Sequence, residues 1–185
     1  MLFKFVSKVK RYDIRQETWL SSYLFFKGVE LLRKIFLSYR HVEPDEKLAN
    51  FMFDFFKDRG YDVFIDKQIL VGQKWVREIE KRIRTCNYFI VLLSKESIQS
   101  DMVREEIMLA RKLAESEDIL ILPVRVDFSG ALPYDLGVHL KSIHFYYWRA
   151  VDAFETVSEE LLKTIHEEIE ILPSVEIQDK TSTIN

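Results

Sequence analysis

The chain has 185 residues, of which 48% are hydrophobic and 31% are charged, a composition typical of one globular domain with a modest extension rather than several catalytic lobes. One cysteine, Cys86, and four histidines exclude a disulfide framework and a Cys/His metal cluster, so no metal ion is expected. The net charge of −3 argues against a nucleic-acid partner.

Residues 1–33 form a basic and aromatic stretch, with seven basic and three acidic side chains and a net charge of +4. Trp19, Tyr23 and Phe26 follow one another at helical spacing. We expect a helical extension that packs on the domain or on a second copy of it. A basic helix on a membrane surface and an arm of another module are the alternatives.

No apolar run of the sequence approaches the ~18 residues that a membrane span needs. Lys4, Lys8 and Lys10 also interrupt the apolar residues at the start of the chain, where a signal peptide would need an unbroken core. We therefore expect a cytoplasmic protein.

From residue 34 to residue 172, strand-like apolar runs alternate with amphipathic helical stretches, which predicts an α/β domain around a parallel sheet. The turn-rich segment 127–137 need not contain a full helix, and the polar tail 173–185 is expected to be disordered. The expected strands are 35–39, 62–65, 88–93, 119–124 and an edge strand 143–147, and the expected helices are 45–58, 74–84, 101–114 and 154–169.

Ligands of an open parallel sheet bind beyond the carboxyl ends of its strands, and three segments converge there. They are the stretch Ser38-Tyr39-Arg40-His41, the loop from Asp66 to Trp75, and the connection from Ser94 to the helix at Asp101. The sequence has no Gly-x-Gly-x-x-Gly or Walker loop, so a phosphate cradle of either kind is not predicted.

Glu106 stands out in the helix predicted over 101–114. With ~100° per residue, the apolar side chains fill one arc of this helix, and Glu106 lies about 40° from Met102, inside that arc. The other charges, such as Arg104 and Glu105, lie outside it. A buried carboxylate is costly unless donors satisfy it. The helical phase leaves two interpretations open, a structural glutamate with a backbone or arginine partner and a functional carboxylate at the ligand edge.

The other polar candidates are ambiguous by themselves. Ser38, Tyr39 and Arg40 could equally cap a helix, fill a corner and form a surface ion pair. Trp75, at a helix start, is as suited to packing as to stacking on a ligand, and Lys74 and Asp66 could be solvated loop residues.

Three ordered segments resemble the TIR (Toll/interleukin-1 receptor) domain family, in particular its bacterial branch. The resemblance implies a flavodoxin-like three-layer sandwich with five parallel strands in the order 2-1-3-4-5, preceded here by the helical extension. The segments are KIFLSYRH, an apolar strand ending in Ser-Tyr; YDVFIDKQILVGQKWVREIEKRI, a strand, a loop with a glycine and a helix; and NYFIVLLSKESIQSDMVREEI, a strand and a helix with a glutamate.

Enzymes of this family cleave the nicotinamide–ribose bond of NAD+, and some cyclise the product. The resemblance places their catalytic glutamate at Glu106 and implies NAD+ as the substrate, with no separate cofactor. The implied substrate contacts are Ser38, Tyr39, Arg40, Asp66, Gly72, Lys74, Trp75 and Met102. Enzymatic members often have tryptophan where this chain has Met102, and a thioether stacks less well on a base.

The resemblance also implies self-association, because many such domains complete their pocket between neighbours. A role in bacterial anti-phage signalling or NAD+ depletion follows, with a separate sensor or effector protein as a further partner. The alternative is a non-catalytic adaptor that acts by TIR–TIR contact, although such scaffolds commonly lack the glutamate. A phospho-receiver would need acidic residues where this chain has Tyr39, Arg40 and Ser94.

Overall fold

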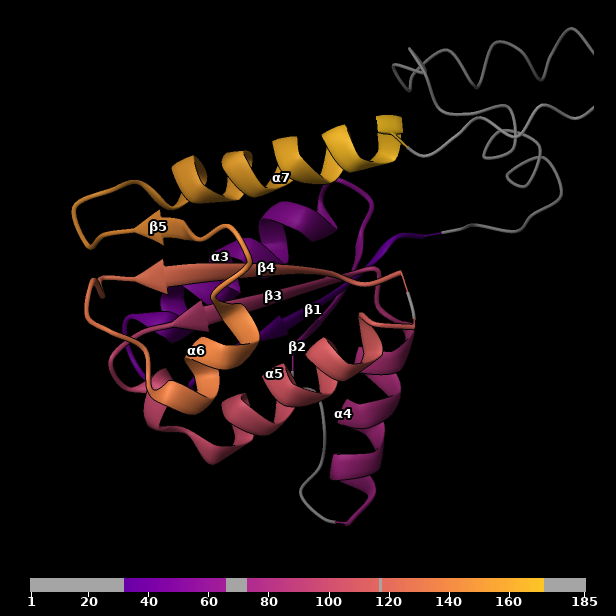
Figure 1. Cartoon of the computed structure of the whole chain (residues 1–185). Coiled ribbons are helices and arrows are strands. Elements are labelled where there is room, and N and C mark those ends of the chain that lie inside the picture. The colour runs from indigo at the N-terminus through magenta and orange to yellow at the C-terminus, as the bar shows by residue number, and fades with distance from the viewer. Residues whose placement is uncertain (1–31, 66–72, 117, 172–185) are drawn as a thin grey trace, which may run out of the picture. The chain divides into compact units, whose positions relative to one another are not determined.

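The computed structural model describes residues 32–65, 73–116 and 118–171 (Figure 1). The side chains of residues 73–75 and 169–171 are not among those described. The extension predicted up to residue 33 lies outside the described residues except for its last two positions, and the predicted tail 173–185 lies outside them entirely.

Five parallel strands form one sheet in the order β2-β1-β3-β4-β5, which confirms the predicted order. Every residue of the central strand β3 is buried, as its unbroken apolar sequence predicts. The strands are β1 (Lys34–Ser38), β2 (Asp62–Ile65), β3 (Tyr88–Leu93), β4 (Leu120–Val126) and β5 (Tyr146–Trp148).

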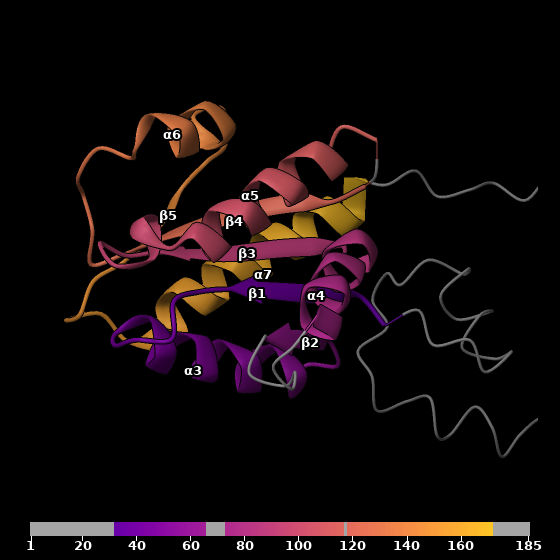
Figure 2. The same cartoon turned by 90° about the horizontal axis from the view of Figure 1, so that it is seen from below.

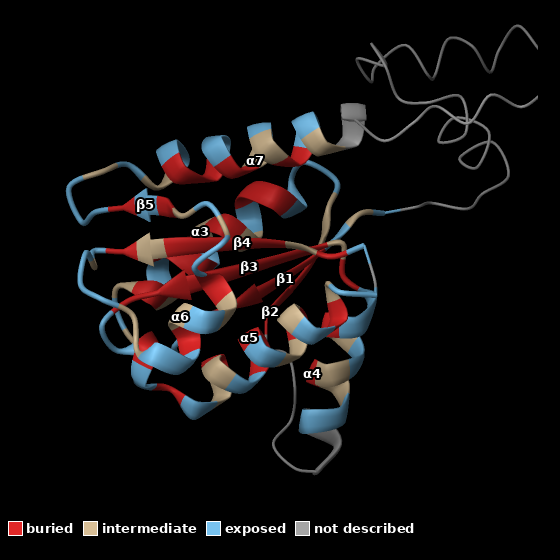
Figure 3. Cartoon of the chain, in the orientation of Figure 1, coloured by how far each residue is buried: buried red, intermediate tan, exposed pale blue. Residues whose placement is uncertain are grey.

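Helices cover both faces of the sheet, so the domain has three layers. In Figures 1 and 2, α3 and α7 lie on one face and α4, α5 and α6 on the other. Figure 3 shows the buried residues concentrated in the strands and on the helix surfaces that face them. The helices are α3 (Asp45–Lys57), α4 (Gln73–Thr85), α5 (Asp101–Leu113), α6 (Tyr134–Leu140) and α7 (Phe154–Ile171), and a short 3-10 helix, η2 (Ser97–Gln99), precedes α5.

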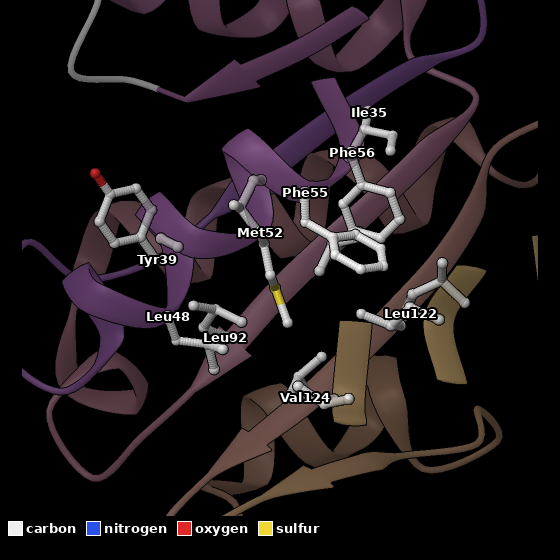
Figure 4. Close-up of a cluster of buried hydrophobic side chains, with 14 of the residues drawn as sticks. Ile35, Tyr39, Leu48, Met52, Phe55, Phe56, Leu92, Leu122 and Val124 are labelled. Carbon is white, nitrogen blue, oxygen red and sulfur yellow. The ribbon is translucent and has the colours of Figure 1, made fainter. Parts of the chain in front are cut away.

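Side chains alternate between the two faces along each strand, as the period of two requires. In β1, Ile35 and Leu37 join the cluster under α3 and α7, whereas Phe36 joins the cluster under α4 and α5. In β3, Leu92 belongs to the α3 side and Leu93 to the α5 side. Figure 4 shows the α3-side cluster, where Leu48, Met52, Phe55 and Phe56 meet Ile35, Leu92, Leu122 and Val124.

The structure corrects two predicted segments. The last four residues of the turn-rich segment 127–137 belong to α6, which begins directly after Pro133, continues to Leu140 and buries Leu136 and Leu140 one helical turn apart. The edge strand is Tyr146–Trp148 rather than 143–147, because β5 pairs only with the last three residues of β4 and Ile143 instead closes the turn after α6. The remaining predicted strands and helices agree with the observed ones to within one or two residues.

Candidate functional site

The candidate site lies at the edge of the sheet where the parallel strands end, the edge at which open α/β sheets bind ligands. Ser38 is the last residue of β1, and Ser94 follows the last residue of β3. The two helices that follow these strands, α3 and α5, begin at the same edge (Figure 1). Residues far apart in the sequence are therefore brought together here.

Glu106 is buried, with only 5% of its surface exposed, as its helical phase predicts. Its Oε2 atom accepts a hydrogen bond of 2.6 Å from the hydroxyl of Ser38. Ser38 is itself 1% exposed, and because it follows Phe36 at a spacing of two it points to the face that α5 covers. The distance is in the range of bonds from a hydroxyl to a carboxylate, which are stronger than neutral hydrogen bonds.

The start of α5 is anchored on both sides, which fixes the direction of the helix that carries Glu106. Ser100 is the N-cap, and its hydroxyl accepts from the backbone N–H of Val103 at 3.5 Å. Arg104 donates from Nε and Nη2 to the carbonyl of Ile98 at 3.1 and 3.0 Å. The same guanidinium pairs with Asp135 of α6 at 3.4 Å.

Tyr39 and Arg40 follow Ser38 but point elsewhere. Tyr39 is 4% exposed and belongs to the cluster under α3 (Figure 4). Since successive side chains of a strand alternate between its faces, its ring lies on the opposite face from Ser38. The ring stacks on His41, with 4.7 Å between ring centroids. Arg40 is exposed. Met102 is half-buried and packs against the α5-side core.

The structure does not describe the side chains of the residues predicted in the loop from Asp66 to Trp75. Asp66 and Gly72 lie outside the described residues. Lys74 and Trp75 lie in the first turn of α4, but their side chains lie outside the described part of the structure. Their predicted roles therefore remain predictions.

Sequence reasoning missed a second buried pair at this edge. Asp45, the first residue of α3, is 0% exposed and Ser94 is 2% exposed. The Ser94 hydroxyl donates to Asp45 Oδ2 at 2.8 Å. Asp45, Leu48, Ala49 and Met52 share the buried stripe of α3, so the helical phase that singles out Glu106 also contains the signal for Asp45.

Burial raises the pKa of Asp45 from 3.8 to about 7, because desolvation disfavours the charged carboxylate. The hydrogen bond from Ser94 and the backbone of Arg40 lower this pKa, and the nearby charge of Glu96 raises it. Oδ1 has no hydrogen-bond partner at bonding distance among the described residues. Desolvation therefore outweighs the combined effect of the Ser94 hydroxyl and the Arg40 backbone.

A separate crevice of about 380 Å³ opens near the beginning of β4, away from the strand ends that carry Ser38 and Ser94. Its walls include Ile119, Leu122, Arg111 and Thr164, and no carboxylate lines it. The imidazole of His144 lines this crevice, but no described carboxylate does, in contrast to the opposite edge with Glu106 and Asp45.

Among the described residues, no three His, Cys, Asp or Glu side chains gather as metal ligands would. No helix in this part of the chain is both long enough and apolar enough to cross a membrane.

Comparison with known proteins gives a family match and several structural neighbours. The sequence model of the family described as TIR domain matches residues 35–162. No curated protein sequence matches the chain.

Three similar solved structures show the same fold. The TIR domains of the activated Roq1 resistosome, which recognises the pathogen effector XopQ, have 17% identity and a TM-score of 0.58, over 72% of this chain and 99% of that chain. The TIR domain of the Toll-related receptor TRR-2 from Hydra magnipapillata has 16% identity and a TM-score of 0.54, over 74% and 97%. A prokaryotic SEFIR domain has 18% identity and a TM-score of 0.54, over 76% and 97%.

Proposed function

This chain belongs to the TIR-domain family, and we propose that it is an NAD+ nucleosidase that cleaves the bond between nicotinamide and ribose. The family contains both NAD+-cleaving enzymes and non-catalytic members, so membership alone does not decide between them. The observation that carries the proposal is the buried carboxylate of Glu106, held by the Ser38 hydroxyl at 2.6 Å at the ligand edge of the sheet.

The reaction suits a site with one carboxylate. When the N-glycosidic bond breaks, its electron pair goes to the ring nitrogen and the cationic nicotinamide leaves as a neutral molecule, so no general acid is needed. The ribose is left as an oxocarbenium-like cation, which a preorganised carboxylate stabilises. Water then adds to the ribose and releases a proton, which gives ADP-ribose.

The neighbouring residues have proposed roles around that carboxylate. Ser38 would fix the direction of Glu106, and Arg40 would offer a cation to the pyrophosphate. Asp66, Gly72, Lys74 and Trp75 would close over the nicotinamide end. Met102, one helical turn before Glu106, would pack against the substrate.

Assembly and biological role form a separate part of the proposal. The site would be completed by TIR–TIR contact between copies of the chain, acting in the cytoplasm in anti-phage signalling or NAD+ depletion. One structural neighbour comes from an assembly, the activated Roq1 resistosome. A separate sensor or effector protein would trigger or read the activity.

One observation favours a non-catalytic adaptor instead. Met102 stands where enzymatic relatives often have tryptophan, and a thioether gives a poorer stacking surface. In an adaptor, Ser38 would simply satisfy a structural glutamate, because a buried carboxylate needs a donor whether or not it catalyses.

Nicotinamide release tests the proposal. The concentrated full chain is incubated with NAD+ and free nicotinamide is followed by chromatography, with assembly monitored by sedimentation. We expect release by the wild type and by Glu105→Gln, an exposed neighbour on the same helix, but not by Glu106→Gln or Glu106→Ala. Equal release by Glu106→Gln would overturn the assignment, and an assembled but inactive wild type would favour the adaptor.

A further inference from the structure

A second buried acid lies on the other side of the sheet from Glu106, and the proposed reaction does not use it. Asp45 is 0% exposed, on a helix stripe that is otherwise apolar. An apolar side chain would fill this position without the desolvation cost of a carboxyl group. The position of Asp45 in the hydrogen-bonding pattern suggests what it contributes.

Two hydrogen bonds close a ring around the carboxyl edge. Segment 38–45 begins at Ser38, which donates to Glu106, and ends at Asp45, which accepts from Ser94. Segment 94–106 begins at Ser94 and ends at Glu106. The two segments are therefore joined to each other at both ends.

The two bonds lie on opposite faces of the sheet. Ser38 continues the α5-facing side of β1, in phase with Phe36, and Ser94 continues the α3-facing side of β3, in phase with Leu92. Because β1 and β3 are neighbouring parallel strands, the ring clamps the edge of the sheet from both sides. Loss of one bond removes one of the two side-chain contacts that join these segments.

Asp45 acts on the segment that leads to Glu106 through the hydroxyl of Ser94. That hydroxyl donates to Asp45 and accepts from the backbone N–H of Ser97 at 3.0 Å. In return, the Ser97 hydroxyl accepts from the backbone N–H of Ser94 at 2.7 Å. Because the hydroxyl proton of Ser94 points to Asp45, a lone pair of the same oxygen faces Ser97 and can accept from its backbone N–H. This second bond holds the residue at which η2 begins.

The chain from this turn to α5 is short. The backbone N–H of Ser100 donates to the carbonyl of Ser97 at 3.0 Å, and Ser100 is the N-cap of α5. We infer that Asp45 is a positioning residue that, through Ser94, Ser97 and Ser100, fixes the start of α5 and so holds the Glu106 carboxylate against Ser38. Its effect on NAD+ cleavage rests on the proposed function, whereas the positioning of Glu106 does not.

Carboxyl NMR tests the positioning without any assay of activity. In full-length protein labelled with ¹³C in the glutamate carboxyl groups, the Glu106 resonance is identified by its loss in Glu106→Gln. We expect Asp45→Ala, which removes the acceptor, and Ser94→Ala, which removes the donor, each to move this resonance, and the double variant to move it no further than either single variant. The control Asp54→Ala changes an exposed acid of the same helix and should leave it in place.

A merely structural Asp45 would lower stability without moving the Glu106 resonance, and that result would overturn the inference, as would additive shifts in the double variant. If Asp45→Ala does not fold, Ser94→Ala carries the same test, because it removes a single oxygen atom from the other partner.

Kinetics tests the consequence for the reaction. Asp45→Ala should lower kcat by about 10-fold or more with little change in KM, since misplacement of a catalytic group slows the chemical step more than binding. An unchanged kcat would overturn the catalytic consequence. A wild type that releases no nicotinamide would defeat the proposed function, while the Glu106 resonance would still decide whether Asp45 positions it.

Discussion

Asp45→Asn should change how the stability of this protein depends on pH. Burial raises the pKa of the Asp45 carboxyl to about 7, against 3.8 for the ordinary group. The folded state therefore favours the protonated carboxyl. The stabilisation that this gives is complete below the unfolded pKa and is lost as the pH rises through the folded pKa. The wild type should lose stability between pH 5 and pH 8 through this one group.

The magnitude follows from the two pKa values. The displacement from 3.8 to about 7 corresponds to about 4 kcal/mol in total, of which about 2 to 3 kcal/mol is lost between pH 5 and pH 8. Asp45 lies in the first turn of α3, where the helix dipole favours a negative charge by about 0.3 to 1 kcal/mol. That gain is too small to cancel the desolvation cost, and the nearby Glu96 adds to the cost.

Urea unfolding of the wild type, Asp45→Asn and Asp54→Asn across this pH range measures the effect. At pH 5, Asp45→Asn should be about 1 to 3 kcal/mol less stable than the wild type, because the amide buries two N–H donors where the protonated carboxyl buries one O–H donor. By pH 8 this difference should shrink or reverse, because only the wild type must ionise a buried group. The same difference at both pH values, or an equal response in Asp54→Asn, would refute this reasoning.

Three other predictions concern the core, the cap of α5 and the cysteine. Ile90→Ala, in the buried centre of β3, should cost about 2 to 5 kcal/mol in urea unfolding, whereas Tyr134→Ala, at a side chain that is 88% exposed, should stay within about 0.5 kcal/mol. Ser100→Ala should lower the free energy of unfolding by about 1 kcal/mol. It should also slow nicotinamide release, because it removes the N-cap of the helix that carries Glu106; unaltered release would show that the cap does not contribute to the position of Glu106. Burial raises the pKa of the Cys86 thiol to about 12, so iodoacetamide should label it, by mass spectrometry, only in unfolded protein, and rapid labelling of the native protein would contradict its burial.

Much of the fold could be predicted because its local signals agree with its tertiary environment. The run Tyr88–Leu93 is apolar throughout, and it lies at the centre of the sheet, buried on both faces. The segment before β5 gave the opposite result. Pro133 and Gly137 are typical of turns, yet Pro133 is the N-cap of a helix, where its missing N–H costs no intrahelical bond. Gly137 lies inside α6, where the burial of Leu136 and Leu140 on the α5 side outweighs its low helix propensity.

The two buried acids explain why only part of the site could be predicted. Each lies on the apolar stripe of its helix, and each accepts a hydrogen bond from the hydroxyl of a serine at or just after the end of a strand. Glu106 is recognisable from the sequence because apolar residues flank it on both sides along the helix. Asp45 is the first residue of α3. Acidic side chains are common in the first turn of a helix because they interact favourably with the helix dipole, so an acid at this position gives by itself no reason to regard Asp45 as buried.

Asp45 can be interpreted as an exposed acid at a helix start or as a buried acid with a partner, and the hydrogen bond from Ser94 decides for the second. The direction of the Ser94 side chain is fixed by the register of β3, because Ser94 points to α3 only if the alternation that begins at Tyr88 continues one residue past the end of the strand. The sequence contains both halves of this pair, but 49 residues separate them, and their contact depends on the pairing of β1 with β3. A buried acid can thus be suspected from helical phase alone, whereas its partner can be assigned only when strand order and register are known.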